Sequence, residues 1–238
     1  MTQEQRHHPN GPLALAVALA AVAGFVDAHV YLHVTHVFVA NMSGNLVHLG
    51  MSAGLVQPGG VAGSAVALLS FVAGIIVATV YHDRQLRLDG RVRPEALLAA
   101  EAILVLMLPA VLIGFGVDFS LRPSAATYLV LTIGSFAMGL QTAALRRVGQ
   151  VAVATTYGTG SLVRIGEKSV LALRGASRAT DHQRRTLWVL LIVLMGYVGG
   201  AATAAALGAS PLLLLLPAAV LVAAAATTAY SPMRRGLQ

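Results

Sequence analysis

The most regular feature of the chain is a series of long apolar runs separated by short polar segments. Each run is close to the roughly 20 residues that a helix needs to cross the hydrocarbon core of a bilayer. The pattern predicts an all-α polytopic membrane protein with about six transmembrane helices. The runs are Leu13–His33, Val61–Tyr81, Ala96–Gly116, Ala125–Leu145, Thr186–Gly208 and Leu212–Tyr230.

A polar stretch with helix-breaking glycines follows the first run and has a counterpart in the second half. Ser-Gly-Asn-Leu-Val-His-Leu-Gly at residues 43–50 matches Thr-Gly-Ser-Leu-Val-Arg-Ile-Gly at residues 159–166. Polar, irregular backbone at membrane depth is tolerated only where protein encloses it or where it lines a wet cavity. Each copy is therefore expected to form a short motif helix, re-entrant or broken, the first of them over Leu46–Val56.

Further matches indicate that the whole chain is duplicated. Gly24–Ala28 aligns with Gly139–Ala143, and Leu-Met-Leu-Pro-Ala at 106–110 aligns with Leu-Leu-Leu-Pro-Ala at 214–218. Each half consists of one span, the motif and two further spans. Because three spans end on the opposite side of the membrane from where they begin, the two halves are predicted to be inverted three-helix repeats. The alternative is that helices rich in Leu, Ala and Val simply resemble one another. The expected organisation is an arm (1–12), a first repeat (13–116), a connecting loop (117–124), a second repeat (125–230) and a tail (231–238).

Composition supports the membrane class and changes how the charge is interpreted. Apolar residues make up 57% of the chain and charged residues 11%, about half the share of charge in a globular protein. The net charge of +7 lies in the segments between apolar runs, so it indicates topology in a lipid bilayer and not a nucleic-acid partner. The chain has no cysteine, which excludes disulfides and thiolate metal sites.

The basic residues favour six spans over eight. If each motif helix re-enters and leaves on its own side, every basic cluster faces the cytoplasm, as the positive-inside rule requires. If both motif helices span instead, the last two clusters lie outside, although 151–173 is long enough to cross. We therefore expect a bacterial inner-membrane protein with both termini in the cytoplasm. The clusters are Arg6, the arginines of 84–93, Arg146-Arg147, those of 174–185 and Arg234-Arg235.

Two carboxylates fall inside predicted spans. A carboxylate inside a membrane is costly and is a functional hypothesis by default. Asp27 is deep enough to carry a proton or to coordinate a cation. Glu101 is close to the start of its span, so a structural glutamate that reaches the interface is the favoured interpretation there.

The motif residues form the rest of the candidate site. Their hydroxyl and amide groups can cap short helices whose N-termini face the protein centre, where free N–H groups suit an anion or a polar solute. The alternative is that these small residues only allow close helix packing. Gln141 and Thr142 occupy the places of Val26 and Asp27, so the halves differ chemically. The candidate substrate-binding residues are Asp27, Asn41, Ser43, Gly44, Asn45, Gln141, Thr142, Thr155, Thr156, Thr159, Gly160 and Ser161.

A histidine series offers a weaker alternative. His29, His33 and His36 share one face if the first helix continues that far, and imidazoles so placed can ligate Zn, Ni or Cu. Histidines that merely hydrate at the interface are commoner, and pairing of one of them with Asp27 as a proton relay is a further possibility. We expect no metal and no cofactor.

The residues just described resemble a known family. Gly24–Ala28, Val-Phe-Val-Ala-Asn-Met-Ser-Gly-Asn at 37–45, Gly139–Ala143 and Ala-Thr-Thr at 154–156 are similar to the YoaK-like bacterial membrane proteins, the domain of unknown function 1275. The resemblance covers nearly the whole chain. It implies a bacterial inner-membrane protein with about six spans and carries no established substrate.

The leading functional interpretation is a transporter or channel for a small polar solute or ion, with its site between the two motif helices. The alternative is a non-transporting membrane protein that binds a partner or lipid or assists assembly. No nucleophile–base set, nucleotide-binding loop or His-Glu-x-x-His helix is found, so we do not expect an enzyme.

Overall fold

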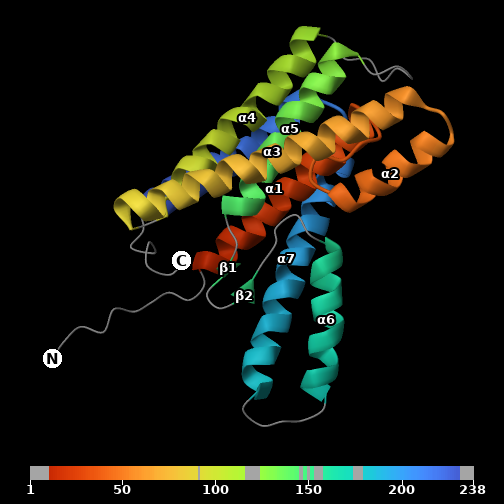
Figure 1. Cartoon of the computed structure of the whole chain (residues 1–238). Helices are drawn as coiled ribbons and strands as arrows, with labels where there is room; N and C mark the ends of the chain where they lie inside the picture. Colours follow the sequence, from red (N-terminus) through yellow and green to blue (C-terminus); the bar gives the residue numbers. More distant parts are fainter. Residues whose placement is uncertain are drawn as a thin grey trace.

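Almost all of the described chain is helical (Figure 1). The computed structural model describes residues 11–90, 92–115, 124–144, 147–148, 151–152, 158–173 and 179–230. Within these residues the strands are a single short antiparallel pair, β1 and β2. The all-α prediction is confirmed. The elements are α1 Gly11–His33, α2 Met42–Gly54, α3 Pro58–Asp89, α4 Pro94–Phe115, α5 Ala125–Ala144, β1 Arg147–Val148, β2 Val151–Ala152, α6 Gly158–Leu173, α7 Ala179–Leu207, the 3-10 turn η1 Pro211–Leu214 and α8 Leu215–Tyr230.

Six of these helices are long and apolar enough to cross a membrane. They are α1, α3, α4, α5, the part of α7 from residue 184, and α8 together with η1. The motif helices α2 and α6 have 13 and 16 residues, shorter than the roughly 20 that a span requires. The prediction of about six transmembrane helices and two short motif helices is therefore confirmed.

Three helix boundaries differ from the sequence-based expectation. The loop expected after the second span begins late, because α3 continues to Asp89 with an Asp83–Arg87 ion pair of 3.0 Å one turn apart. The helix α3 is capped at its C-terminus by Gly90, whose φ of 63° lies in the left-handed region that favours glycine. α2 starts at Met42, earlier than expected, because the Asn41 side chain caps it. The second basic segment is partly helical, since α7 begins at Ala179.

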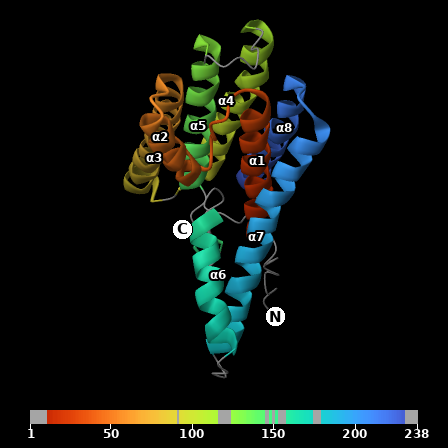
Figure 2. The ribbon, with the colours of Figure 1, turned by 90° about the vertical axis from the view of Figure 1, so that its right-hand side faces the viewer.

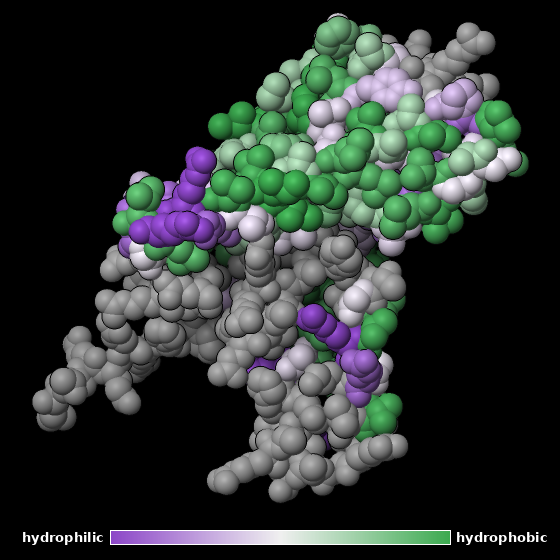
Figure 3. Space-filling view, in the orientation of Figure 1, coloured by the Kyte–Doolittle hydropathy of each residue, from purple (hydrophilic) through white to green (hydrophobic). Residues whose placement is uncertain are grey.

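The surface divides as expected for helices in lipid. The face in view is apolar along α3 and becomes hydrophilic at the far end of that helix (Figure 3). Leu69, Val72 and Ile76 of α3 are exposed, and lipid rather than water is the solvent that suits such a row. The hydrophilic end carries Asp83 and Arg87.

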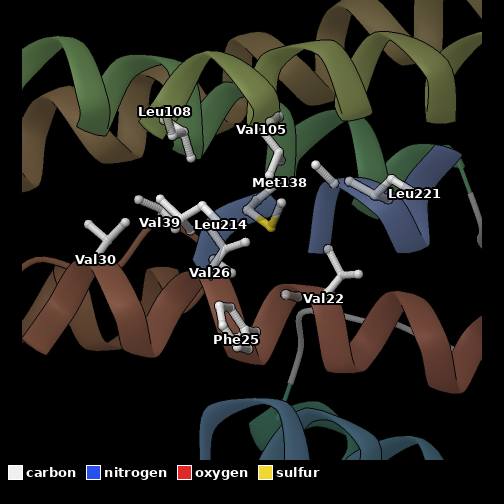
Figure 4. Packing of buried hydrophobic residues seen from close by; sticks show 14 of the residues in the cluster. Val22, Phe25, Val26, Val30, Val39, Val105, Leu108, Met138, Leu214 and Leu221 are labelled. Carbon is white, nitrogen blue, oxygen red and sulfur yellow. The ribbon is translucent and has the colours of Figure 1, made fainter. Parts of the chain in front are cut away.

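The core lies where α1, α4, α5 and α8 meet. Figure 4 shows Val26 of α1, Val105 of α4 and Met138 of α5 directed into one apolar cluster. Leu221 of α8 belongs to the same cluster. Since lipid is as apolar as this core, close packing rather than exclusion of water holds such helices together.

Two helix crossings are built in the same way, from facing glycines. At the α1–α7 crossing a side chain on Gly24 would overlap the Tyr197 carbonyl, and one on Gly200 would overlap the Ala21 carbonyl. At the α3–α5 crossing a side chain on Gly74 would overlap the Phe136 carbonyl, and one on Gly139 would overlap the Phe71 carbonyl. Missing side chains let the backbones touch at both crossings.

Helices in matching positions of the two halves also pack against matching helices of the chain. α1 packs along α7 and α5 along α3, while α2 lies on α3 and α6 on α7. α4 and α8 pack against each other. Two related halves with a twofold axis between them would produce this arrangement. The inverted repeat itself stays a prediction.

The motif helices leave the middle of the molecule in opposite directions. α2 begins beside the buried turn that follows α1 and runs along α3 toward the turn into that helix (Figure 1). α6 begins at the bundle and runs away from it, forming with the first part of α7 a hairpin that projects beyond the other helices (Figure 2). The two helices are therefore not equivalent in their surroundings.

Candidate functional site

Residues 34–41, which we call the re-entrant segment because their backbone turns back into the helix bundle, connect α1 to α2. Val39 and Ala40 of this segment are buried in the bundle, and Val39 lies beside Leu214, between α1 and α4 (Figure 4). Asp27 holds this turn in place. One carboxylate oxygen accepts hydrogen bonds from the Val39 and Ala40 amides at 2.7 and 2.8 Å, and the other accepts one from the Asn41 amide at 3.1 Å.

A fourth donor reaches the same carboxylate from the other half of the chain. The Tyr197 hydroxyl on α7 donates a hydrogen bond to the Asp27 oxygen that also accepts from Asn41. Asp27 is 1% exposed, and a buried carboxylate is tolerated when its oxygens are hydrogen-bonded in this way. Asp27 thus ties three segments together: α1, the re-entrant segment and α7.

The amide side chains of the first motif stabilise the same turn. Asn45, fully buried, donates from its side chain to the Phe38 carbonyl at 2.7 Å and accepts from the Phe38 amide at 2.9 Å. The Asn41 side-chain oxygen accepts from the Ser43 hydroxyl at 2.9 Å and from the Gly44 amide at 3.4 Å, capping α2. Ser43 itself is exposed. The structure therefore brings Asp27, Asn41, Ser43, Gly44 and Asn45 together around one turn.

The second-half candidates are more dispersed. Gln141 is buried in α5 and donates to the Leu19 carbonyl of α1 at 3.0 Å, and Thr142 donates to the Met138 carbonyl of its own helix at 2.8 Å. Gly160 is exposed near the start of α6. The remaining four candidates are not placed by these contacts. Thr155 and Thr156 lie outside the described residues, and the side chains of Thr159 and Ser161 are likewise outside what the structure describes.

The three histidines of the first helix region do not form one cluster in this arrangement. His29 and His33 meet edge to face with ring centroids 5.1 Å apart, whereas the His36 ring lies against Tyr31. Across the described residues, no three His, Asp or Glu side chains are grouped as metal ligands. Asp27 is bonded to amides and a phenol instead of an imidazole.

Sequence reasoning missed Tyr197, although a signal was present. Tyr-Val-Gly-Gly at 197–200 repeats the form of Phe-Val-Ala-Gly at 71–74, and each ends on a crossing glycine. By this match Tyr197 corresponds to Phe71, just as Asp27 corresponds to Thr142 in the aligned helices. The α1–α7 crossing therefore has the Asp–Tyr pair, and the α3–α5 crossing has Thr142 and Phe71 in its place.

Glu101 differs from the expectation that it reaches an interface. It is 0% exposed, and neither carboxylate oxygen has a hydrogen-bond partner among the described residues. The expectation failed because depth along a helix does not decide exposure. Glu101 lies on the stripe of α4 that also carries Leu98, Ala102 and Val105, all in the central core.

Comparison with known proteins places the chain beside others of unassigned activity. The sequence profile of a family described as protein of unknown function (DUF1275) matches residues 15–227. UPF0700 transmembrane protein YoaK of Bacillus subtilis (strain 168) is 29% identical over 184 residues, covering 76% of this chain and 77% of that protein. No solved structure matches.

Proposed function

Because the chain belongs to the DUF1275 family, whose description assigns no activity, we propose its function from its own structure. It is a transporter or channel for a small polar solute or ion. The site lies between the beginnings of the two motif helices. The protein resides in a bacterial inner membrane with both termini on the cytoplasmic side.

The observation that carries this proposal is the re-entrant segment. Its backbone turns inside a bundle of membrane-spanning helices, and the short helix α2 starts there. A scaffold that only needs to span the bilayer gains nothing from such a break, whereas transporters build their binding sites from discontinuous helices and irregular backbone. The segment is moreover held by three amide hydrogen bonds to one buried carboxylate, which also accepts one from Tyr197 of α7, so the break is stably formed.

The second motif helix supports the same interpretation. α6 starts at the bundle and runs the opposite way from α2 (Figures 1 and 2). Two short helices that diverge from the middle of a molecule present their N-terminal ends to the space between them. The hydroxyl-bearing residues Thr159 and Ser161 are at that end of α6.

The contacts of the first motif narrow the class of ligand. The amides of Val39, Ala40 and Asn41 already bind the Asp27 carboxylate, so the chain's own anion fills the place that an anionic solute would occupy. The exposed Ser43 hydroxyl keeps oxygen lone pairs available. These facts support a neutral polar solute or a cation at this motif.

The orientation follows from where the charged ends lie. α1, α4 and α7 begin at the same end of the bundle at which α3 ends (Figures 1 and 2). Arg84 and Arg87 of α3 and Arg184 and Arg185 of α7 are thus on one side. The positive-inside rule makes that side the cytoplasm.

Ligand binding and uptake test the proposal. Purified protein is screened by thermal shift against sugars, polyols, amino acids and mono- and divalent cations, because a ligand of the native state raises its melting temperature. Any hit is then followed for uptake into proteoliposomes. Ser43→Ala should weaken binding, whereas Thr203→Ala, which removes an exposed hydroxyl bonded to its own helix on α7, should not. A protein that binds and accumulates none of these classes would contradict the proposal.

The projecting hairpin favours a second candidate, binding of a partner protein without transport. Leu162 and Val163 of α6 and Trp188 of α7 are exposed, and the hairpin extends beyond the bundle (Figure 2). Replacing all three by serine would abolish this function and leave solute uptake unchanged. Loss of uptake in that variant, with its melting temperature preserved, would instead assign these residues to transport.

A further inference from the structure

The described residues of the helices that pack against α4 around Glu101 carry no charge. α4 packs against α5, α8 and η1. Among all residues of α5 and α8 the titratable ones are Tyr128 and Tyr230, each near a helix end, and η1 has none. Tyr230 is also largely exposed. The titratable group that α3 adds near this part of α4 is Tyr81, which packs against the cluster that contains Leu97. Asp27 on α1 already accepts from four donors.

Among the described residues, an ionised carboxylate in this position would have no compensating charge or hydrogen bond. Burying an isolated carboxylate is costly even after its surroundings relax, and this cost drives such groups to take up a proton. The two oxygens of Glu101 have no hydrogen-bond partner among the described residues. The resident form in this conformation is therefore the neutral acid.

The surroundings also decide which cation the group can hold. Ca²⁺ takes about six to eight oxygen ligands and Mg²⁺ about six in an octahedron. Glu101 is a single carboxylate, and the described residues contain no group of three His, Asp or Glu side chains. A proton needs one carboxylate oxygen and no further ligand.

Glu101 is close enough to one end of the bundle to exchange that proton. It lies seven residues from Pro94, the start of α4, or about 10 Å along the helix axis. Leu97 and Leu98 are buried between it and that end. Separation of α4 from its neighbours would open this path, and closure would seal it.

We propose that Glu101 is a proton-binding site that exchanges its proton with the cytoplasmic side and links its protonation state to the transport cycle. The role of Glu101 in transport rests on the proposed function. Its proton binding is a separate property that can be measured without knowledge of the solute. In one cycle the O–H bond forms on one Glu101 oxygen when the path opens and breaks when the proton returns to water.

Infrared difference spectroscopy of the full chain in lipid tests the site directly. The carbonyl stretch of a neutral carboxylic acid should be present near neutral pH, be lost in Glu101→Gln, and decrease as the pH is raised. Glu95→Gln, a matched change at the start of the same helix, should keep the band. A band that is absent, or that does not change across the pH range in which the protein stays folded, would overturn the proposal.

Labelling with the hydrophobic carbodiimide DCCD gives an independent measurement. It adds to a neutral carboxyl group in an apolar site, so peptide mass spectrometry should place the adduct on Glu101 in the wild type and in Glu95→Gln. Glu101→Leu, which keeps an apolar core if Gln does not fold, should lose the adduct. An adduct elsewhere only would refute the assignment. Failure to find any transported solute would contradict the proposed function and leave these two results standing.

Discussion

The Tyr197 hydroxyl donates a hydrogen bond to the Asp27 carboxylate, and this contact joins residues 170 positions apart in the chain. It connects α7 of the second half to the re-entrant segment of the first, because the same carboxylate binds the amides of residues 39–41. The pair gives Asp27 a defined task in the folded protein, that of a buried anchor.

Removal of the phenol should loosen this anchor without destroying it. Tyr197→Phe leaves three amides on the carboxylate, so the fold should persist with a loss of about 1.5–3 kcal/mol, the range for a hydrogen bond to a charged group. Urea or thermal unfolding in detergent measures the change. Tyr128→Phe, on an end of α5, is the matched control and should be close to wild type. Equal stability of all three proteins would show that the Tyr197 contact contributes nothing.

The pair also offers a test of the inverted repeat. If Phe71 and Thr142 are the counterparts of Tyr197 and Asp27, Thr142→Asp alone should destabilise the protein by burying an unpaired carboxylate. Adding Phe71→Tyr should recover part of that loss, with a coupling of about 0.5–3 kcal/mol in a double-mutant cycle. Strictly additive effects would argue against equivalent positions.

Much of this fold could be anticipated from the sequence, and the reason is the bilayer. Length and apolar composition decide which segments span, so the six long helices follow from simple periodicity and length. The motif predicted a break after the first span. The structure has one, but it lies at residues 34–41, before the motif, and residues 43–50 are helical in α2. Helix ends were less predictable, because α3 continues through a polar segment that was expected to be a loop, in which Asp83 and Arg87 pair one turn apart.

The candidate site was anticipated less well, because partners distant in sequence decide what a side chain does. Asp27 was singled out for its depth, yet its role depends on Tyr197 and on the amides of the re-entrant segment. Glu101 was set aside for its nearness to a helix end, yet burial on all sides makes it the carboxylate without a partner in the described structure. Neither fact is visible from residue type and spacing alone.

Glycine at the α1–α7 crossing should be irreplaceable, while its neighbour should tolerate change. An added Cβ at Gly200 would overlap the Ala21 carbonyl, whereas one at Gly199 would meet nothing within 4 Å. Gly200→Ala should therefore cost at least about 1–3 kcal/mol through overpacking, and Gly199→Ala should be neutral or slightly stabilising. Folded yield and melting temperature of the two variants decide the matter. Similar values for both would mean that the helices cross elsewhere.

The six-span topology predicts one side for three basic sites. Reporter fusions after Arg93, Arg185 and Arg235 should all report the cytoplasm. The chain has no cysteine, so a single cysteine at the exposed Leu55, in the turn between α2 and α3, should react with an impermeant thiol reagent from outside the cell. A periplasmic signal at Arg185 would mean that the second motif helix spans, and the six-span arrangement would fail.

The two buried carboxylates should respond to neutralisation in opposite ways. Asp27→Asn keeps the size of the side chain but removes the charge that four donors bind. The amide NH2 group that replaces one carboxylate oxygen is itself a donor, so it cannot accept the hydrogen bonds that this oxygen accepted. The melting temperature should fall clearly, by more than for Tyr197→Phe, because buried donors lose their acceptor. Glu101→Gln and Glu101→Leu leave no partner unsatisfied, so stability should be unchanged or higher, as when other uncompensated buried acids are replaced.

The effects on uptake should be the reverse of the effects on stability. Once a solute is known, both Glu101 variants should lose the pH dependence of uptake, whereas the Asp27→Asn protein that remains folded should keep it. A stable Asp27→Asn together with a strongly destabilised Glu101→Leu would reverse the roles assigned to the two residues.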